Sequence, residues 1–403
     1  MPESESTATL GAAQIFSGLT TLEAEVLDQA DRFARAELHP LAKRMDDEEW
    51  WPPDAFRLIG ANGYFGVTAP PALGGAGADL FTSGLVLQAI ARWNHALALS
   101  WVAHENLCLH NILRNATPSQ LEKYAPPLCS GKAVGALGLT EPGAGSDALG
   151  SMRTTATRDG DCYRLNGTKL YITNGPVADV LLVYAKTDPQ RGSQGISAFI
   201  VERSFPGFRV AQKLSKMGFR GSPTGELVFD DCRVPAANRL GEENEGVKVV
   251  MSGLDLERAM VAPLCLGIAE RALQLSIDYA RTREQFKRPI ASFQMIQDKL
   301  ATMYVWVESM RVFTYQALRA ASAIAERGEA GRGEIHKITA ASVMHAAQTM
   351  NRVLDEAVQI HGGAGYIWES EVNRLYRSIK LLEIGAGTTE VRKMIIAGEL
   401  LKH

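Results

Sequence analysis

Glu257 is the residue of this chain whose type and sequence neighbours best suit acid–base catalysis. At helical spacing it has Gly253 and Leu254 one turn before it and Met260 and Val261 one turn after it, so no basic residue stands where an ion pair would form. A carboxyl group in apolar surroundings is costly to ionise, so its pKa should rise toward neutrality, where a general base works best. Glu257 is therefore a candidate base. The alternatives are a pair with a distant arginine or lysine, or a position in solvent.

A glycine-rich stretch from Leu139 to Asp147 could bind an anion or the edge of a flavin, because such a loop exposes backbone N–H groups. Gly143, Gly145 and Ala148 fit a loose G-x-G-x-x-A dinucleotide pattern. Met152 to Thr157 reads as a strand, however, where that pattern requires a helix. The dinucleotide interpretation therefore fails, and a surface β-turn is the alternative to a flavin or phosphate loop.

Two further groups contain reactive residue types. His104, Cys108 and His110 could bind a metal, but helical spacing leaves His110 off the face that the other two share, so we expect helix packing and no metal site. Asp255 has Arg258 three residues later, the spacing of a local ion pair.

The elements that must position these residues change type twice along the chain. Residues 20–131 have helical periodicity, residues 132–246 alternate with the period of strands, and residues 247–403 return to long helices. This order predicts an α+β protein with an N-terminal helical domain, a middle antiparallel β domain and a C-terminal helical bundle.

Turn and cap residues refine this outline. Asp159-Gly160 and Asn166-Gly167 are dipeptides typical of tight hairpins. Thr117 is expected to cap a helix that ends before Pro126-Pro127, because proline disfavours helical backbone in the residue before it. Thr388 is a plausible cap for the last helix.

The composition of the 403 residues is ordinary, with a net charge of −3, so nothing favours nucleic acid or an anionic membrane as a partner. The longest uncharged apolar stretches, such as Met260 to Ala269, are too short to cross a bilayer. Five scattered cysteines form no Cys-x-x-Cys pair, which favours a reducing compartment. The N-terminus has neither a transit nor a signal pattern, so we expect a cytoplasmic protein.

Five motifs, in order across about residues 20 to 400, resemble the acyl-CoA dehydrogenase family. They are TEPGAGSD at 140–147, KLYITNG at 169–175, RxxF at 283–286, QIHGG at 359–363 and EIGAGTTE at 383–390. The resemblance implies the helical, β and four-helix-bundle domains expected above. It also implies a homotetramer in which FAD is held partly across a subunit interface.

The resemblance assigns roles to residues of this chain. In one subunit the flavin would contact Leu137, Leu139, Thr140, Gly145, Ser146, Tyr171, Ile172 and Thr173. The FAD of a neighbouring subunit would contact Arg283, Phe286, Gln294, Gln359, Ile360, Gly362 and Gly363, and Thr388, Thr389 and Glu390 would also contact FAD. The acyl-CoA would contact Ser146, Lys248, Asp255, Leu256, Arg258, Gly385, Ala386 and Gly387.

The reaction that the resemblance implies is the α,β-dehydrogenation of an acyl-CoA. A base removes the proton α to the thioester, a hydride leaves the β carbon for flavin N5, and the electrons pass to an electron-transferring flavoprotein. Most members carry the base at the position of Ala386, whereas the isovaleryl-CoA and long-chain branches carry it at the position of Glu257. The sequence is most similar to the isovaleryl-CoA branch, and the small Gly385 and Ala386 would leave room for a branched acyl chain.

Several residues depart from the pattern of that branch. Lys248 replaces a tyrosine, Trp101 a smaller aromatic residue, Tyr171 a tryptophan and Lys287 a glycine. The first two leave other substrates open, such as citronellyl-CoA or a medium or long straight-chain acyl-CoA. An oxygen-using flavoenzyme and a non-catalytic flavin or CoA-binding protein are the alternatives of a different class.

Overall fold

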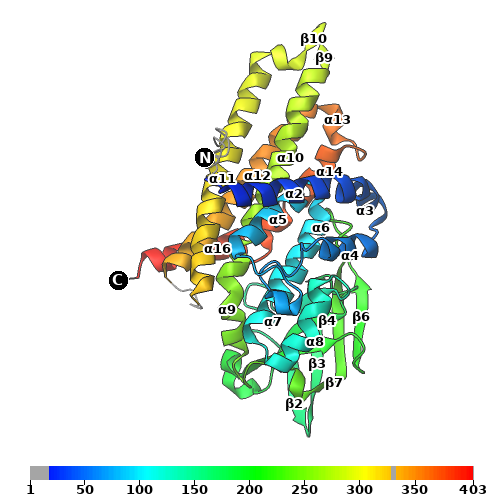
Figure 1. Ribbon diagram of the computed structural model, residues 1–403, viewed down its shortest axis with the longest axis vertical. Helices are drawn as coiled ribbons and strands as arrows, with labels where there is room; N and C mark the ends of the chain where they lie inside the picture. Colours follow the sequence, from blue (N-terminus) through cyan, green and yellow to red (C-terminus); the bar gives the residue numbers. More distant parts are fainter. Residues whose placement is uncertain (1–17, 328–332, 403) are drawn as a thin grey trace, which may run out of the picture.

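A computed structural model describes residues 18–327 and 333–402 (Figure 1). Along the long axis of the molecule, helices occupy one end and the middle, and the β domain occupies the other end. The helical, β and helical order along the chain is the one predicted from the periodicity.

The N-terminal region is helical. Its elements are α2 (Thr21–Phe33), α3 (Ala42–Glu48), α4 (Pro53–Ala61), α5 (Leu80–Trp93), α6 (His95–Trp101), the π-helical η4 (Val102–Leu109), α7 (His110–Asn115) and α8 (Pro118–Cys129). Thr117 caps α8 as predicted, with the side chain of Gln120 completing a capping box. The predicted end before Pro126 is wrong, since α8 continues through both prolines to Cys129. Only Leu128 and Cys129 follow them in α8, and both side chains are buried.

The middle region forms one eight-stranded sheet with the order β6-β7-β3-β2-β4-β5-β8, and β1 pairs with β4. The main strands are β1 (Gly135–Gly138), β2 (Thr155–Asp159), β3 (Cys162–Thr173), β4 (Val180–Lys186), β5 (Ile196–Glu202), β6 (Phe208–Lys213), β7 (Thr224–Pro235) and β8 (Arg239–Leu240). The sheet is not wholly antiparallel as predicted, because β1 and β2 both pair with β4 in parallel. Strand β6 has mostly exposed side chains and was not anticipated.

Only one of the two predicted hairpin dipeptides forms a turn. Asp159-Gly160 joins β2 to β3, with Gly160 at a φ of 62°. Asn166-Gly167 instead lies inside β3, where the pairing with β7 shifts by one residue. The Asn166 amide donates to the Asp231 carboxylate at 3.0 Å and accepts from the Asp231 N–H at 2.8 Å, so this cross-strand pair stabilises a bulge in place of a turn.

The C-terminal region contains four long helices and several short ones. They are α9 (Gly246–Ala259), α10 (Val261–Thr282), α11 (Gln294–Glu326), α12 (Glu334–His361), α13 (Gly363–Tyr366), α14 (Glu371–Ser378), α15 (Leu381–Ile384) and α16 (Thr389–Leu400). The short strands β9 (Glu284–Gln285) and β10 (Arg288–Pro289) form a hairpin that joins α10 to α11 at one extreme of the molecule (Figure 1). By length and composition, the helical stretch Gly246–Thr282 could cross a membrane, but 72% of its most apolar window is buried, as in a core helix.

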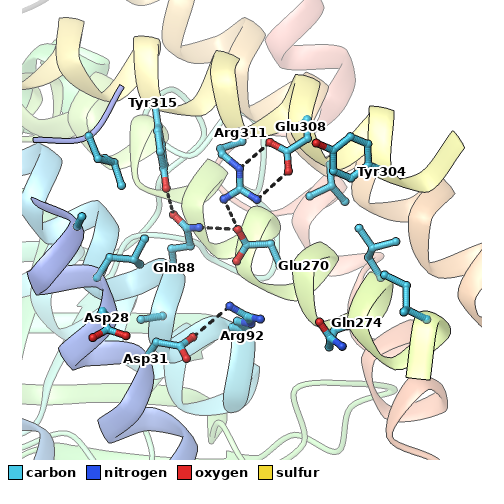
Figure 2. A pocket seen from close by; sticks show the side chains of 17 residues that line it. Asp28, Asp31, Gln88, Arg92, Glu270, Gln274, Tyr304, Glu308, Arg311 and Tyr315 are labelled. Carbon is cyan, nitrogen blue, oxygen red and sulfur yellow. Dashed lines mark hydrogen bonds and ion pairs between the residues drawn. The ribbon is translucent and has the colours of Figure 1, made fainter. Parts of the chain in front are cut away.

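A cavity of about 880 Å³ lies between α2, α5, α10 and α11 (Figure 2). Its polar side chains bond to one another: Gln88 donates to Glu270 at 2.8 Å, Arg311 contacts the same carboxylate, and the Tyr315 hydroxyl donates to Gln88. No predicted site residue lines this cavity, so the candidate site lies elsewhere.

Candidate active site

Glu257 lies on α9 with only 7% of its surface exposed. Burial raises the pKa of its carboxyl group to about 7, as the apolar pattern predicts. The Asn111 amide on α7 donates to Glu257 Oε1 at 2.6 Å, and this bond opposes the rise. Asn111 was not predicted as a site residue, because 146 residues separate it from Glu257 and no local spacing links them.

Some charged groups around the Glu257 carboxyl group raise its pKa and others lower it. Arg258 and Arg114 lower the pKa of Glu257, and Asp255 raises it. The hydroxyl group of Tyr184, on β4, is buried near the same carboxyl group and finds no hydrogen-bond partner in the described part of the chain. The group thus lies in a polar but poorly hydrated setting, where its ionisation responds strongly to each neighbour.

Asp255 and Arg258 form the predicted ion pair, with Arg258 Nη1 and Asp255 Oδ1 3.2 Å apart and both side chains buried. His336 of α12 adds a contact of 2.5 Å to the same carboxylate oxygen. Leu256 is buried in the helical core. Lys248 is instead exposed and lies 3.3 Å from Glu245, near the beginning of α9.

Strand β1, which leads into the predicted flavin loop, pairs with β4, the strand that carries Tyr184. Gly138, the last residue of β1, pairs with Val183 of β4, and the next residue of β4 is Tyr184. Leu137, Leu139 and the α9 residue Met251 border one apolar cluster. Side chains from β1, from the residue after it and from α9 therefore pack against the same apolar core.

A buried ion pair fixes the loop that follows β1. Lys169 Nζ lies 2.8 Å from Glu141 Oε1, and the same carboxylate accepts backbone N–H groups of Arg153 at 2.6 Å and Thr154 at 3.0 Å. These contacts hold the pKa of Glu141 below its usual range, although burial opposes them. The backbone from residue 140 to 147 is therefore anchored at Glu141, while Gly145 and Ser146 remain exposed.

The loop and the neighbouring bulge of β3 fit a flavin. A Cβ built at Gly145 would meet nothing within 4 Å, so the backbone there is open to a ligand. The register shift between Lys169 and Ile172 leaves the Tyr171 ring 65% exposed at a φ of 63°. The side chain of Ile172 is buried, so only its backbone could face the flavin, whereas Thr173 is half-buried. Exposed backbone N–H groups and hydroxyls suit the polar edge of an isoalloxazine ring.

The remaining predicted flavin residues lie far from this loop in a single chain. Arg283, Phe286 and Gln294 are exposed at the β9–β10 hairpin and the beginning of α11, at the end of the molecule opposite the sheet (Figure 1). Gln359, Gly362 and Gly363 are exposed at the end of α12 and the beginning of α13, whereas the Ile360 side chain is buried. One copy of the chain therefore does not bring the two groups together.

The loop from Gly385 to Gly387 carries the position where most family members would place the base. Ala386 has a φ of 54°. Arg392, which is fully buried, donates through Nη2 to the carbonyl oxygens of Leu382 at 3.0 Å and Gly385 at 2.6 Å. Thr388 caps α16 as predicted, followed by the buried Thr389 and the exposed Glu390.

Comparison with known proteins identifies the fold. Three family models match in order: the acyl-CoA dehydrogenase N-terminal domain over residues 20–132, the middle domain over 136–232 and the C-terminal domain over 244–401. An Arabidopsis thaliana protein named isovaleryl-CoA dehydrogenase, mitochondrial, is 44% identical over 93% of this chain and 90% of its own length. A Solanum tuberosum protein named 2-methylacyl-CoA dehydrogenase, mitochondrial, is 43% identical over 92% and 89%. The structure of butyryl-CoA dehydrogenase from Megasphaera elsdenii matches with a TM-score of 0.89 and 38% identity, over 95% of this chain and 99% of that one.

With these matches in the same order as the helical, β and helical regions, the fold is that of an FAD-dependent oxidoreductase. The chain belongs to the acyl-CoA dehydrogenase family.

Proposed function

We propose that Glu257 removes the α proton of a short branched acyl-CoA, with isovaleryl-CoA as the first candidate. The observation that carries the proposal is the buried Glu257 carboxyl group, with its pKa raised to about 7 and one oxygen held by Asn111 of α7. A base with this pKa is ionised in part at neutral pH and still holds a proton well. Bound FAD would supply the hydride acceptor, and an electron-transferring flavoprotein would take the electrons.

The residues of this chain would perform the remaining tasks. The apolar cluster at Leu137, Leu139 and Met251 would exclude water from the acyl chain, which strengthens electrostatic interactions at the carboxylate. Asp255 and Arg258 would contact the acyl-CoA through groups that their mutual ion pair already orients.

The preference for a branched acyl chain rests on size. Gly385, Ala386 and Gly387 have small or no side chains, so a substrate that contacts this loop would have room for a methyl branch. The relatives at 44% and 43% identity are named for isovaleryl-CoA and 2-methylacyl-CoA, both of which are methyl-branched. Trp101 stands where the isovaleryl-CoA branch has a smaller aromatic residue. It is fully buried and donates to the Tyr64 carbonyl at 2.6 Å, so its indole belongs to the helical core.

The proposed substrate is tested by anaerobic titration of the yellow holoenzyme with isovaleryl-, 2-methylbutyryl-, butyryl-, octanoyl- and citronellyl-CoA. We expect the two short branched thioesters to bleach the flavin absorbance fastest. Faster bleaching by octanoyl- or citronellyl-CoA would favour a longer substrate, and no bleaching by any thioester would refute dehydrogenation. Rapid reoxidation of the bleached protein in air would favour the oxygen-using alternative.

The role of Glu257 has its own test in the same assay. Glu257→Gln keeps the size of the side chain but removes its basicity, so we expect flavin reduction to slow by at least 10²-fold, the lower end of general-base contributions. Reduction at the wild-type rate would move the base to another carboxylate, with Glu383 the first to examine.

We further propose a homotetramer in which each flavin site is completed by a neighbouring copy. The exposed Arg283, Phe286 and Gln294 support this, since 88% of the Phe286 surface is exposed in the single chain.

We also propose domain boundaries near residues 131 and 246, where α8 is followed by β1 and where α9 begins. A cytoplasmic location remains part of the proposal, and the five free cysteines are compatible with it.

A further inference from the structure

The contact between α7 and α9 joins two helices through a side chain that the family resemblance does not assign. Asn111 Nδ2 donates to Glu257 Oε1 at 2.6 Å, and only 2% of the Asn111 surface is exposed. The hydrogen bonds that residues 18–327 and 333–402 make to this carboxyl group reach Oε1 and leave Oε2 without a partner. One carboxyl oxygen is thus held while the other remains available.

The orientation of the Asn111 amide follows from its two partners. Nδ2 also donates to the Leu107 carbonyl oxygen, one turn earlier on its own helix, at 2.9 Å. Both partners are acceptors, so the nitrogen and not the oxygen of the amide must face them. The Asn111 amide is therefore fixed by its own helix with a donor directed at Glu257.

Gly253 supplies the space for this contact. A Cβ added at Gly253 would lie 3.0 Å from both Asn111 Oδ1 and Glu257 Oε1, closer than ordinary packing allows. Glycine in the interior of a helix destabilises it relative to alanine, so its presence here needs a local reason. The close approach of the amide and the carboxyl group is that reason.

We infer that Asn111 is the positioning residue of the Glu257 carboxyl group, and that Gly253 provides the room in which the two side chains meet. The inference rests on the proposed role of Glu257 as the base. The amide holds Oε1, so Oε2 faces the remaining space and receives the α proton of the substrate. Since α7 belongs to the N-terminal helices and α9 to the C-terminal ones, the base is correctly held only when these two regions are packed together.

Asn111 also affects the ionisation of the base. A donor to the carboxylate favours its charged form and so lowers the pKa. The charged and titratable groups that face the same carboxyl group are Arg114 on α7, Asp255 and Arg258 on α9, and Tyr184 on β4, with His336 of α12 contacting Asp255. Since these groups remain when Asn111 is replaced, the loss of its donor should raise the pKa of Glu257.

The test compares the pH dependence of kcat/KM for Asn111→Leu and Asn115→Leu with that of the wild type. Asn115 is a matched control: it lies one turn later on α7 and donates to Ser252 of α9 at 3.3 Å, without contact to the carboxyl group. We expect the acidic limb of Asn111→Leu to move up by about one pH unit or more, as the strength of a hydrogen bond to a charged group implies. Asn111→Gln, which retains the amide, should recover part of the shift. An acidic limb in Asn111→Leu that matches the one in Asn115→Leu would overturn the inference.

Gly253→Ala gives an independent test in a variant that should fold, because alanine favours the helix. It keeps the Asn111 donor but crowds both oxygens, so we expect kcat to fall at least tenfold with the melting temperature unchanged or higher. Wild-type kcat in this variant would overturn the role of Gly253. The role of Glu257 as the base fails separately: it is refuted if Glu257→Gln reduces its flavin at the wild-type rate. If Glu257→Gln is inactive and neither Asn111→Leu nor Gly253→Ala behaves as described, only the positioning role is wrong.

Discussion

Glu257 combines two properties that oppose each other, since its carboxyl group is buried and the proposed reaction requires it to ionise. The pKa of this group rises from 4.5 to about 7 on folding. Between those pH values the folded protein binds more protons than the unfolded chain, so stability falls as the pH rises from about 4.5 to about 7. Above pH 7 the full cost applies, on the order of 3 kcal/mol at about 1.4 kcal/mol per pKa unit.

Glu257→Gln should therefore stabilise the fold while it removes activity. We expect its melting temperature to exceed that of the wild type at pH 8, and the difference to shrink toward zero near pH 5. Thermal unfolding at several pH values measures this, with Glu122→Gln on the exposed face of α8 as a control that should show no such trend. A constant difference at all pH values would mean that the Glu257 carboxyl group is not the titrating group.

At the scale of elements, the anchor between Glu141 and Lys169 determines where the flavin loop lies. Burial lowers the pKa of Lys169 to about 8, and Glu141 is the charge that opposes this effect. Lys169→Met would leave the Glu141 carboxylate buried without its counter-charge, a loss of about 3–5 kcal/mol for pairs of this kind. We expect reduced FAD retention and a lower melting temperature in this variant.

The neutral double variant separates charge from packing at this anchor. Glu141→Gln combined with Lys169→Met leaves no buried charge, so it should recover much of the stability that Lys169→Met loses. Chemical denaturation and the FAD content of the purified variants measure both effects. A double variant as unstable as Lys169→Met alone would show that packing, not charge, dominates.

Periodicity predicted the order of helical and β regions because each long element repeats its apolar spacing many times. It failed where a tertiary contact overrode a local signal. Asn166-Gly167 has the residues of a turn, but Asp231 on β7 pairs with Asn166 across the strands. The prolines predict an end of α8 before Pro126, but the helix extends to Cys129, where the Leu128 side chain is buried.

In the candidate site, too, residues linked by local spacing were predicted and a residue linked only by tertiary packing was not. The sequence identified the buried carboxyl group of Glu257 and the local pair of Asp255 and Arg258, since both follow from spacing on one helix. It could not identify Asn111, which reaches Glu257 only through the packing of α7 on α9. The one available signal was Gly253, a glycine in the middle of an apolar helix one turn before the acid.

At the scale of the whole molecule, the proposed sharing of flavin sites can be tested by mixing defective copies. Arg283→Ala should weaken FAD binding at the neighbouring site, and Glu257→Gln should inactivate its own site. In a mixed assembly, a site with Glu257 from one variant and Arg283 from the other is intact, so activity should return. We expect the coexpressed variants to be more active than either variant alone. If each site used only residues of its own chain, the mixture would remain inactive.

The projecting β9–β10 hairpin has a consequence for handling the enzyme if it completes a neighbour's flavin site as proposed. Cofactor retention and subunit association would then be one linked equilibrium, and the law of mass action would apply to both. Dilution would release FAD even without any change in temperature or pH, and added FAD would restore the assembly. The rate at which the purified protein loses FAD on storage would thus depend on its concentration.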